Sequence, residues 1–342
     1  MRTAVVILNW NGINLLREFL PPLLDSCRGL ADVVIADNAS TDGSVAWLRQ
    51  EHPEIQLIVH AENMGYAQGY NEALKELHHE YFVLLNSDVQ VTPGWITILQ
   101  SFMDEHPGVG VCQPKMLWHR QPESFEYAGA AGGFIDFLGY PFCRGRIFTE
   151  LEKDTGQYND HISVFWASGA CMMIRSDIYR LAGGFDNSFF AHMEEIDLCW
   201  RILLRGYTIA CNGNAKVYHV GGATLPKINP RKTYLNFRNN LTMLFKNLPL
   251  RYLVPVLLAR IFMDLVAALK FLFEGDRADF LAVLKAQLVF AARVLSGKVH
   301  RTKNIRGKLP ETVYRKSIVW NYYVGRIRKF TDLNIKTQQV QP

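Results

Sequence analysis

Short apolar runs alternate with segments of helical periodicity along the first quarter of the chain. Runs of this length, rich in Val, Ile and Leu, are typical of strands buried on both faces. The segments between them place apolar residues three and four positions apart, which is the spacing of an amphipathic helix. We predict strands at 4–10, 33–36, 55–59 and 82–85, and helices at 13–26, 44–50 and 66–77. This alternation indicates βαβ units and a parallel sheet.

Polar loops follow these strands at one edge of the predicted sheet. Residues 9–12, 37–44 and 86–88 each come directly after a strand, and residues 63–66 begin a helix. Asn, Asp and Ser are also common in turns and helix caps, so each loop alone has a local explanation. Because parallel strands end together at the edge where open α/β sheets bind ligands, the loops as a set predict a nucleotide site.

The sequence lacks the glycine-rich phosphate loops of common nucleotide-binding folds. Residues 9–12 read Asn-Trp-Asn-Gly, which contains neither Gly-x-Gly-x-x-Gly nor a Walker-type lysine. A site without such a loop can hold a diphosphate through a divalent cation, because Mg²⁺ uses one or two carboxylates together with substrate phosphates. Asp88, which follows the strand at 82–85, is the predicted carboxylate.

A second acidic segment lies much further along the chain. Glu194, Glu195 and Asp197 occupy the first turn of a predicted helix, where the helix dipole favours negative charge. That local role explains part of the charge. Aromatic and apolar neighbours within 189–200 can also desolvate a carboxyl, which raises its pKa toward that of a working base. These carboxyls are therefore candidate general bases.

The stretch between the two acidic segments has little regular periodicity. Residues 108–115 read as a further strand, whereas residues 118–160 are rich in Gly, Pro and aromatic side chains. A loop this long in a compact domain is usually functional. We expect 118–160 to be irregular, and its aromatic residues within 127–140 to form either an acceptor-side lid or a packed surface loop.

Charge divides the chain into two parts. Residues 1–226 carry 15 Lys and Arg against 26 Asp and Glu, and residues 227–342 carry 22 against 6, so charges of −11 and +16 make up the net +5. We predict a nucleotide-binding domain over 1–226 and a basic, apolar helical region over 227–342. Such asymmetry indicates an anionic partner. The six scattered cysteines, without a secretory signal, are expected to be reduced thiols of a cytoplasmic protein.

The basic region is predicted to contain helices at 234–246, 252–273 and 280–295. The second is the most apolar, but Arg260, Asp264 and Lys270 interrupt it, so it lacks the unbroken run expected of a spanning helix. Basic, apolar helices suit the surface of an anionic bilayer. Packing of these helices on the rest of the protein is the alternative. Because no nucleic-acid-binding motif accompanies the charge, we expect no nucleic acid partner.

The motifs, taken in order, resemble those of family 2 glycosyltransferases with the GT-A fold, most closely the rhamnosyltransferase-like branch. The resemblance covers about residues 3–225 and implies a mixed, mainly parallel sheet flanked by helices, followed here by a membrane-associating helical region. Each motif is weak alone, but their shared order and spacing are specific. The matching segments are 5–12, 37–44, 63–67, 85–88, 169–175, 183–186 and 194–201.

The resemblance implies roles for the residues that match the family's motifs. Asp37 would contact the nucleotide base, and Asn9 and the loop at Asn63 would line the same pocket. Arg201 would stabilise charge on the diphosphate. The remaining residues implied to bind the nucleotide-sugar are Asn11, Asn38, Gly65 and Asn86.

A metal site is implied by the same comparison. Asp88 matches the last carboxylate of the family's Asp-x-Asp metal motif, whereas Asn86 replaces the first, which leaves the number of protein ligands open. His219 follows a strand-like segment and is a candidate second ligand. A structural role in the core is the alternative for this histidine. The expected cofactor is Mg²⁺ or Mn²⁺.

Glu195 aligns with the family's catalytic acidic residue, and Glu194 and Asp197 remain alternatives. The implied reaction is inverting transfer of a sugar, rhamnose or similar, from a nucleotide-diphosphate sugar to a lipid-linked or polysaccharide acceptor in cell-surface glycan synthesis. The favoured donor is dTDP-rhamnose, and a UDP-sugar is possible. The protein would bind peripherally to the cytoplasmic face of the inner membrane.

Two other functions are considered. A catalytically inactive, membrane-associated nucleotide-sugar-binding scaffold would have no need of Asp37, Asp88 and Glu195 together. A nucleotidyltransferase would normally carry a Gly-rich, basic loop after the first strand, and residues 9–14 contain none. The donor sugar, the acceptor linkage and the oligomeric state do not follow from the sequence.

Overall fold

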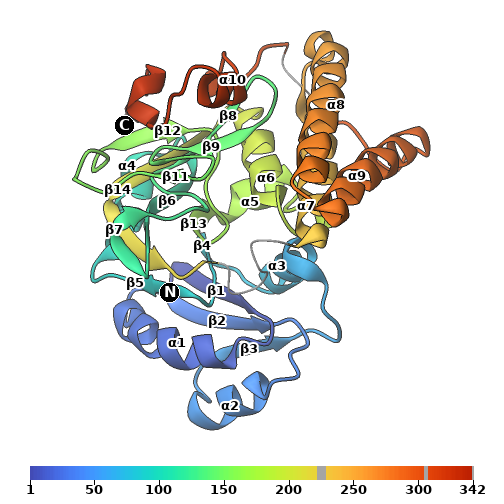
Figure 1. Ribbon diagram of the computed structural model, residues 1–342. Helices are drawn as coiled ribbons and strands as arrows, with labels where there is room; N and C mark the ends of the chain where they lie inside the picture. Colours follow the sequence, from blue (N-terminus) through green and yellow to red (C-terminus); the bar gives the residue numbers. More distant parts are fainter. Residues whose placement is uncertain (222–228, 304–306, 341–342) are drawn as a thin grey trace.

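The protein is described by a computed structural model over residues 1–221, 229–303 and 307–340 (Figure 1). Its larger sheet contains ten strands within these residues. They are β1 (Thr3–Asn9), β2 (Asp32–Asp37), β3 (Gln56–Val59), β4 (Tyr81–Leu85), β5 (Val89–Val91), β6 (Val109–Trp118), β7 (Gln121–Phe125), β12 (His161–Val164), β13 (Cys171–Arg175) and β14 (Thr208–His219). The strands predicted near residues 4, 33, 55, 82 and 108 are therefore confirmed.

The larger sheet is mixed, with parallel strands at the end that carries the polar loops. Its order is β12-β14-β6-β13-β4-β1-β2-β3, with β5 paired to β14 and β7 paired to β6. Strands β1 to β4 pair in parallel with one another, whereas β13 is antiparallel to both β4 and β6. This topology confirms the predicted α/β class and brings the carboxyl ends of β1, β2 and β4 to one edge.

Helices cover both faces of the larger sheet (Figure 1). Successive residues of a strand point to opposite faces, so Ala4 and Val6 of β1 join the core with Tyr70, while Val5 packs on the other face with Leu16. This double burial explains the near-continuous apolar runs in the sequence. The helices are α1 (Ile13–Cys27), α2 (Ser44–Glu51), α3 (Gly65–Lys75), α4 (Trp95–Glu105), α5 (Ser176–Ala182), η1 (Asn187–Phe189) and α6 (Glu194–Leu203).

Residues 118–160 differ from the expected irregular loop, because they supply β7 and four strands of a second sheet. This sheet has the order β11-β10-β9-β8-β15. Phe134 is buried and packs with Phe142 and Phe330, so it is a core residue and not part of a lid. Strands this short are stabilised by tertiary packing and leave no periodic pattern. The strands are β8 (Gly133–Asp136), β9 (Pro141–Cys143), β10 (Arg146–Ile147), β11 (Glu150–Leu151) and β15 (Val313–Tyr314).

The C-terminal region is mainly helical and contacts the rest of the protein through several of its elements. Strand β15 pairs with β8, and α7 packs against α6. In Figure 1, α8 and α9 lie at the rim of the molecule, beyond α7. Within the described residues, no helix is long and apolar enough to cross a membrane. The helices are α7 (Pro230–Asn247), α8 (Leu250–Phe273), α9 (Arg277–Leu295), α10 (Ile318–Tyr323) and η2 (Phe330–Leu333).

Candidate active site

Asn9 and Asp37 lie side by side at the ends of β1 and β2. The strands pair these residues directly, and Nδ2 of Asn9 donates to Oδ2 of Asp37 at 2.8 Å. The backbone N–H of Ser40 donates to Oδ1 of Asp37 at 2.8 Å. The buried Oδ1 of Asn9 has no hydrogen-bond partner among the described residues, and a Cβ at Gly12 would meet it at 2.5 Å. Glycine at position 12 therefore leaves room for this acceptor.

Asn11 joins the loop after β1 to the loop after β2. Its φ of 50° lies in the left-handed region, which Asn tolerates better than most residues. Its Oδ1 accepts from the N–H of Thr41 at 2.8 Å, and its own N–H donates to Oγ of Ser40 at 2.8 Å. Asp42 accepts in the same way from the N–H of Ile13 at 2.8 Å. The two polar loops therefore form one rigid unit.

The third polar loop is tied to the second by asparagine side chains. Nδ2 of Asn38 donates to Oδ1 of Asn63 at 3.0 Å and to the carbonyl of Gly65 at 3.1 Å. Gly65 has a φ of 74°, and a Cβ there would lie 2.7 Å from the carbonyl oxygen of Phe190. That same oxygen accepts from the N–H of Tyr66 at 2.8 Å. Glycine at position 65 thus allows Phe190, in the segment before α6, to contact the polar loop at residues 63–66. We call this loop, together with the loops at 9–12 and 37–44, the nucleotide-side loops.

Asp88 and His219, which are 131 residues apart in sequence, meet through strand pairing. Strand β5 follows Asp88 directly and pairs antiparallel with the end of β14, where Val89 lies opposite His219. Nε2 of His219 lies 3.1 Å from Oδ1 of Asp88, and both side chains are buried. Burial alone would raise the pKa of Asp88, but the contact with His219 lowers it below the usual range.

Asp88 and His219 form a hydrogen-bonded pair, so His219 would have to lose its shared proton before both side chains could bind a divalent cation. Ligands about 2.1 Å from Mg²⁺ at right angles lie about 3.0 Å apart, which is close to the separation of the two atoms. Within the described residues, no group of three or more His, Cys, Asp or Glu side chains is placed to hold a metal. A cation here would therefore need ligands from the substrate diphosphate and water. Asn86 lies at the end of β4, where its N–H donates to the carbonyl of Ala170 at 2.9 Å.

Glu126 is a site residue that the sequence did not single out. Its Oε1 lies 3.3 Å from Nδ1 of His219, on the opposite side of the ring from Asp88. Burial would lower the pKa of His219, but the two carboxylates raise it to about 10. A carboxylate behind a histidine commonly orients the ring for a metal on its other nitrogen. Glu126 directly follows β7, in the stretch interpreted as an irregular loop, so no motif marked it.

Glu194 and Glu195 begin α6 after a strained segment. Phe190, His192 and Met193 have φ values of 66°, 69° and 72°, a conformation that costs of order 1–3 kcal/mol for each residue and is concentrated at functional sites. Oε2 of Glu194 and Oε2 of Glu195 are both buried without a hydrogen-bond partner among the described residues. The backbone thus holds two carboxyls in place without neutralising them.

The two glutamates differ in exposure and in pKa. Glu194 is buried, whereas Glu195 is partly exposed. Burial raises the pKa of Glu195 to about 7. For Glu194, burial and then the charge of Glu195 raise the pKa well above its usual value. A partly exposed carboxyl that ionises near neutral pH is suited to accept a proton, so Glu195 meets this requirement better than Glu194.

Asp197, the third predicted candidate, is enclosed by cations and amides. Oδ2 of Asp197 lies 3.0 Å from Nζ of Lys246 on α7, and Oδ1 accepts from Nδ2 of Asn247 at 2.8 Å. Lys246 also pairs with Asp186 at 2.5 Å. Although burial opposes ionisation of Asp186, this pairing lowers its pKa to about 2. The structure thus places Asp197 in a buried ion-pair network that joins α6 to α7.

Arg201 belongs to the same network. Its Nε donates to Oδ2 of Asp197 at 2.8 Å, and Nη2 donates to the carbonyl of Gly184 at 2.7 Å. Nη1 donates to the carbonyl of Ala182 at 2.5 Å. Arg201 is therefore directed at the end of α5, and the structure does not bring it to the Asp88–His219 pair.

Helix α7 also supports the strained segment before Glu194. Nδ2 of Asn239 lies 3.0, 2.9 and 2.8 Å from the carbonyl oxygens of Phe189, Ala191 and His192. The side chain is buried. Because a carbonyl left without a donor in the interior is costly, Asn239 stabilises the left-handed backbone that aims the two glutamates. This support was not apparent from the sequence, since it comes from a helix about 50 residues downstream.

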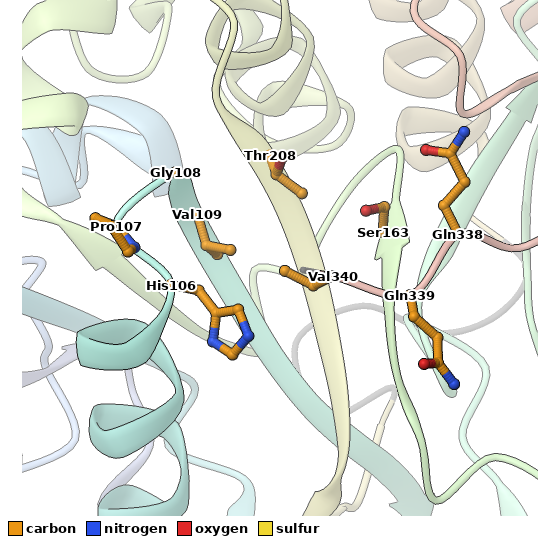
Figure 2. Close-up of a pocket in the computed structure, with 9 residues that line it drawn as sticks. All are labelled: His106, Pro107, Gly108, Val109, Ser163, Thr208, Gln338, Gln339 and Val340. Carbon is orange, nitrogen blue, oxygen red and sulfur yellow. The ribbon is translucent and has the colours of Figure 1, made fainter. Parts of the chain in front are cut away.

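A cavity of about 570 Å³ lies at the opposite edge of the sheet (Figure 2). Its lining includes the first residues of β6 and β14, Val109 and Thr208, and the C-terminal residues 338–340. The Asp88–His219 pair lies at the other end of β14. We therefore do not assign the nucleotide site to this cavity.

Comparison with known proteins identifies the family. The model of "Glycosyl transferase family 2" matches residues 4–181. N-acetylglucosaminyl-diphospho-decaprenol L-rhamnosyltransferase of Mycobacterium tuberculosis is 28% identical over 222 residues, covering 60% of this chain and 71% of the relative. The low-salt glycan biosynthesis hexosyltransferase Agl10 of Haloferax volcanii is 24% identical, covering 69% of this chain and 73% of the relative.

Solved structures share the fold at low sequence identity. GalNAc-T7, solved with UDP, GalNAc and Mn²⁺, has a TM-score of 0.56 at 12% identity; the match covers 72% of this chain but only 48% of that one. The mannosyltransferase PcManGT of Pyrobaculum calidifontis, solved with GDP-Man and Mn²⁺, has a TM-score of 0.51 at 17% identity, covering 87% and 79%. Taken with the family match, these findings show that the chain belongs to glycosyl transferase family 2 and has the GT-A fold.

Proposed function

We propose that this protein is a metal-dependent, inverting hexosyltransferase whose donor is a nucleotide-diphosphate sugar. The observation that carries the proposal is that one short segment joins two parts of the site. The carbonyl of Phe190 accepts from the N–H of Tyr66 at the nucleotide-side loops, and the same segment leads directly into Glu194 and Glu195. A donor pocket and a base are thus held by the same piece of backbone.

Each group has a defined task in this proposal. Asp37 and Asn9 bind the nucleotide, while Asp88 and His219 hold Mg²⁺ or Mn²⁺. A bound cation would neutralise charge on the diphosphate as it leaves. Glu195 accepts the proton of the acceptor hydroxyl as that oxygen attacks the anomeric carbon from the face opposite the diphosphate.

We assign Arg201 and Asp197 to support of this site. Their polar atoms contact the protein itself, in the network with Lys246. The same distinction favours Glu195 over Asp197 as the base, because both carboxyl oxygens of Asp197 are already occupied by hydrogen bonds within the protein.

The donor and acceptor are proposed from the relatives. The Mycobacterium relative is named as an L-rhamnosyltransferase acting on N-acetylglucosaminyl-diphospho-decaprenol, and Agl10 is named as a hexosyltransferase of glycan biosynthesis. We propose dTDP-rhamnose as the favoured donor, with a UDP-sugar as the alternative, and a lipid-linked saccharide as the acceptor. Because such an acceptor lies in a membrane, the protein would work at the anionic cytoplasmic face of the inner membrane, held there by the basic C-terminal region.

Nucleotide binding tests the donor site directly. In a thermal-shift assay with dTDP, UDP and GDP, with and without Mn²⁺, the correct nucleotide is expected to raise the melting temperature only when the metal is present. Asp88→Ala should abolish the metal-dependent part of the shift. Asp25→Ala, which removes an exposed carboxylate paired with Arg28, is the matched control and should behave as wild type. If no nucleotide shifts the wild-type protein with metal, the donor-site proposal fails and an inactive scaffold becomes the better explanation.

A further inference from the structure

Helix α8 buries charged side chains and exposes large apolar ones, which is the reverse of the usual arrangement in a water-soluble protein. Its buried face includes two charged side chains, Arg260 and Asp264, which are 2% and 0% exposed. Nη2 of Arg260 donates to Oδ1 of Asp264 at 3.0 Å, and Nη1 donates to the carbonyl of Leu138 at 3.2 Å. The guanidinium also lies over the ring of Tyr140 at 3.7 Å. Arg260 and Asp264, two of the residues that interrupt the apolar sequence of α8, thus face the second sheet.

The opposite side of α8 consists of large apolar side chains that point to solvent. We call these residues the outer face; they recur every three or four positions and are between 46% and 85% exposed. Amphipathic helices normally turn such a stripe toward the core, and monomeric soluble proteins rarely expose a contiguous apolar patch of this kind. The outer face consists of Leu250, Val254, Leu258, Phe262, Val266, Leu269 and Phe273.

Neighbouring helix α9 carries a second, sparser apolar stripe. Leu281, Leu288 and Leu295 lie seven residues apart, about two turns, and are 60%, 71% and 88% exposed. The two helices pack against each other and lie together at the rim of the molecule (Figure 1). Exposed apolar surface is therefore concentrated on this helical pair.

Residues 250–303 carry more positive than negative charge. Residues 250–303 contain nine Lys and Arg and four Asp and Glu. Of the four acidic residues, Asp264 is paired with Arg260 and Glu274 with Lys270. Long basic side chains can keep their charge at a polar boundary while their stems cover apolar surface. Arg251, Lys270, Arg277 and Lys285 are exposed on α8 and α9, and we call these four side chains the basic rim.

We propose that the outer face of α8 inserts into the interfacial layer of an anionic lipid bilayer, with the helix lying in the plane of the membrane. The apolar stripe would lie at the boundary of headgroups and acyl chains, and the basic rim would contact lipid phosphates. This proposal deepens the membrane association suggested under the proposed function and rests on it for the identity of the membrane. Its structural support, the inverted helix, is independent of the reaction.

A second copy of the chain fits this surface less well. Pairing two outer faces would bring two basic rims together, and like charges facing each other across an interface disfavour association. An anionic bilayer supplies both the apolar layer and the opposite charge. The placement also has a consequence for catalysis, because α7 packs on α8 and α9 and its Asn239 holds the segment before Glu194. Only α7 therefore lies between the membrane-binding helices, α8 and α9, and the segment that leads to the predicted base.

Vesicle flotation of the full chain tests the proposal. Wild-type protein should float with phosphatidylcholine vesicles that contain phosphatidylglycerol, and much less with phosphatidylcholine alone. Leu258→Asp combined with Phe262→Asp should reduce the bound fraction about tenfold or more, because charge on the apolar face opposes insertion. Leu181→Asp is a matched control, since Leu181 is also an exposed leucine, at 56%, but lies on α5. It should bind vesicles as wild type does.

The possible outcomes separate this proposal from its alternatives. Equal flotation of the double variant and wild type would overturn it, and so would equal binding to both kinds of vesicle. If wild type ignores vesicles but forms a dimer that the double variant dissociates in size-exclusion chromatography with light scattering, a second copy covers the face. Nucleotide-induced thermal shifts, measured without vesicles, report the donor site separately, so a failed flotation does not count against the glycosyltransferase assignment.

Discussion

Helix α6 carries two kinds of buried carboxyl within four residues. Asp197 is surrounded by Arg201, Lys246 and Asn247. Glu194 and Glu195 each have a carboxyl oxygen with no hydrogen-bond partner among the described residues. An unpartnered polar group in the interior is costly, so a folded protein usually keeps one only where it has a task. We therefore propose that the carboxyl with partners holds the helix and that those without partners take part in the reaction.

Glu195→Gln tests the reactive side of this contrast and should have the largest effect. Without a proton acceptor at this position, we expect kcat to fall by about 10²–10⁴, with little change in the donor-induced thermal shift. Wild-type activity should be lost as the pH falls below about 7, where Glu195 becomes protonated. Radiolabelled sugar transfer over a range of pH measures both effects. Activity of the variant within a few-fold of wild type would assign the base elsewhere.

The same variant should be more stable than wild type at alkaline pH. The pKa of Glu195 is raised in the folded state, so its contribution to stability is present at low pH and is lost as the pH rises toward 7. Gln has no charge to bury, and we expect a gain of about 1–3 kcal/mol in the free energy of unfolding at pH 8. Urea unfolding at pH 5 and pH 8 measures the difference. No gain at pH 8 would show that Glu195 is well solvated when ionised.

Lys246→Met tests whether the ion pairs of Asp197 stabilise the fold. The change removes the cation shared by Asp197 and Asp186 and leaves buried negative charge with fewer partners, which is expected to cost about 3–5 kcal/mol in the free energy of unfolding. Lys75→Met is the control, because Lys75 forms an exposed pair with Glu72 and should cost less than about 1 kcal/mol. Equal losses in denaturant unfolding would contradict a stabilising role for the buried network.

The sequence predicted the nucleotide side of the molecule well because its signals are local. Strands buried on both faces leave continuous apolar runs, and the loops after β1, β2 and β4 follow them directly. Parallel pairing then brings those loops to one edge without further information. Asn9 and Asp37 could therefore be placed together in advance, and the structure pairs them.

The parts of the structure that could not be predicted from the sequence depend on contacts between distant segments. Strands of two to four residues in the second sheet have no readable period, and β15, which pairs with β8, comes from the C-terminal region. Asp88 and His219 were both identified, but only the pairing of β5 with β14 brings them together. Arg260 interrupts the apolar pattern of α8, and nothing in that pattern shows that it faces the second sheet.

Asn239→Ala asks whether α7 positions the unpartnered carboxyls. Loss of the amide leaves the carbonyls of Phe189, Ala191 and His192 without this donor, and we expect a loss of about 1–3 kcal/mol in stability. If the segment also aims Glu195, kcat should fall about tenfold with little change in the donor KM, and the apparent pKa of the activity profile should move down toward that of a solvated Glu as water enters.

Asn240→Ala is the control for Asn239→Ala, on the same helix and of the same residue type. Its Nδ2 donates to the carbonyl of Gly139 in the turn between β8 and β9 at 2.8 Å and contacts Sδ of Met193 only weakly, at 3.9 Å, so Asn240→Ala should lower stability and shift the pH profile less than Asn239→Ala does. If the two variants shift the profile equally, the effect is general loosening of α7 and Asn239 is not a positioning residue.

Glu194→Gln is the smallest change and sharpens the comparison between the two glutamates. Glu194 is buried and its pKa is raised well above the usual range, so its surroundings favour the neutral form, and a neutral amide should replace it with a less than about threefold loss of kcat. Removing Glu194 as a neighbour should also lower the apparent pKa of the activity profile if the two carboxyls titrate together. The pH profile of sugar transfer tests this. A loss of kcat as large as that of Glu195→Gln would mean that the two glutamates act as one proton-sharing pair. Glu194 and Glu195 would then both take part in the reaction, and Asp197 alone would have a structural role.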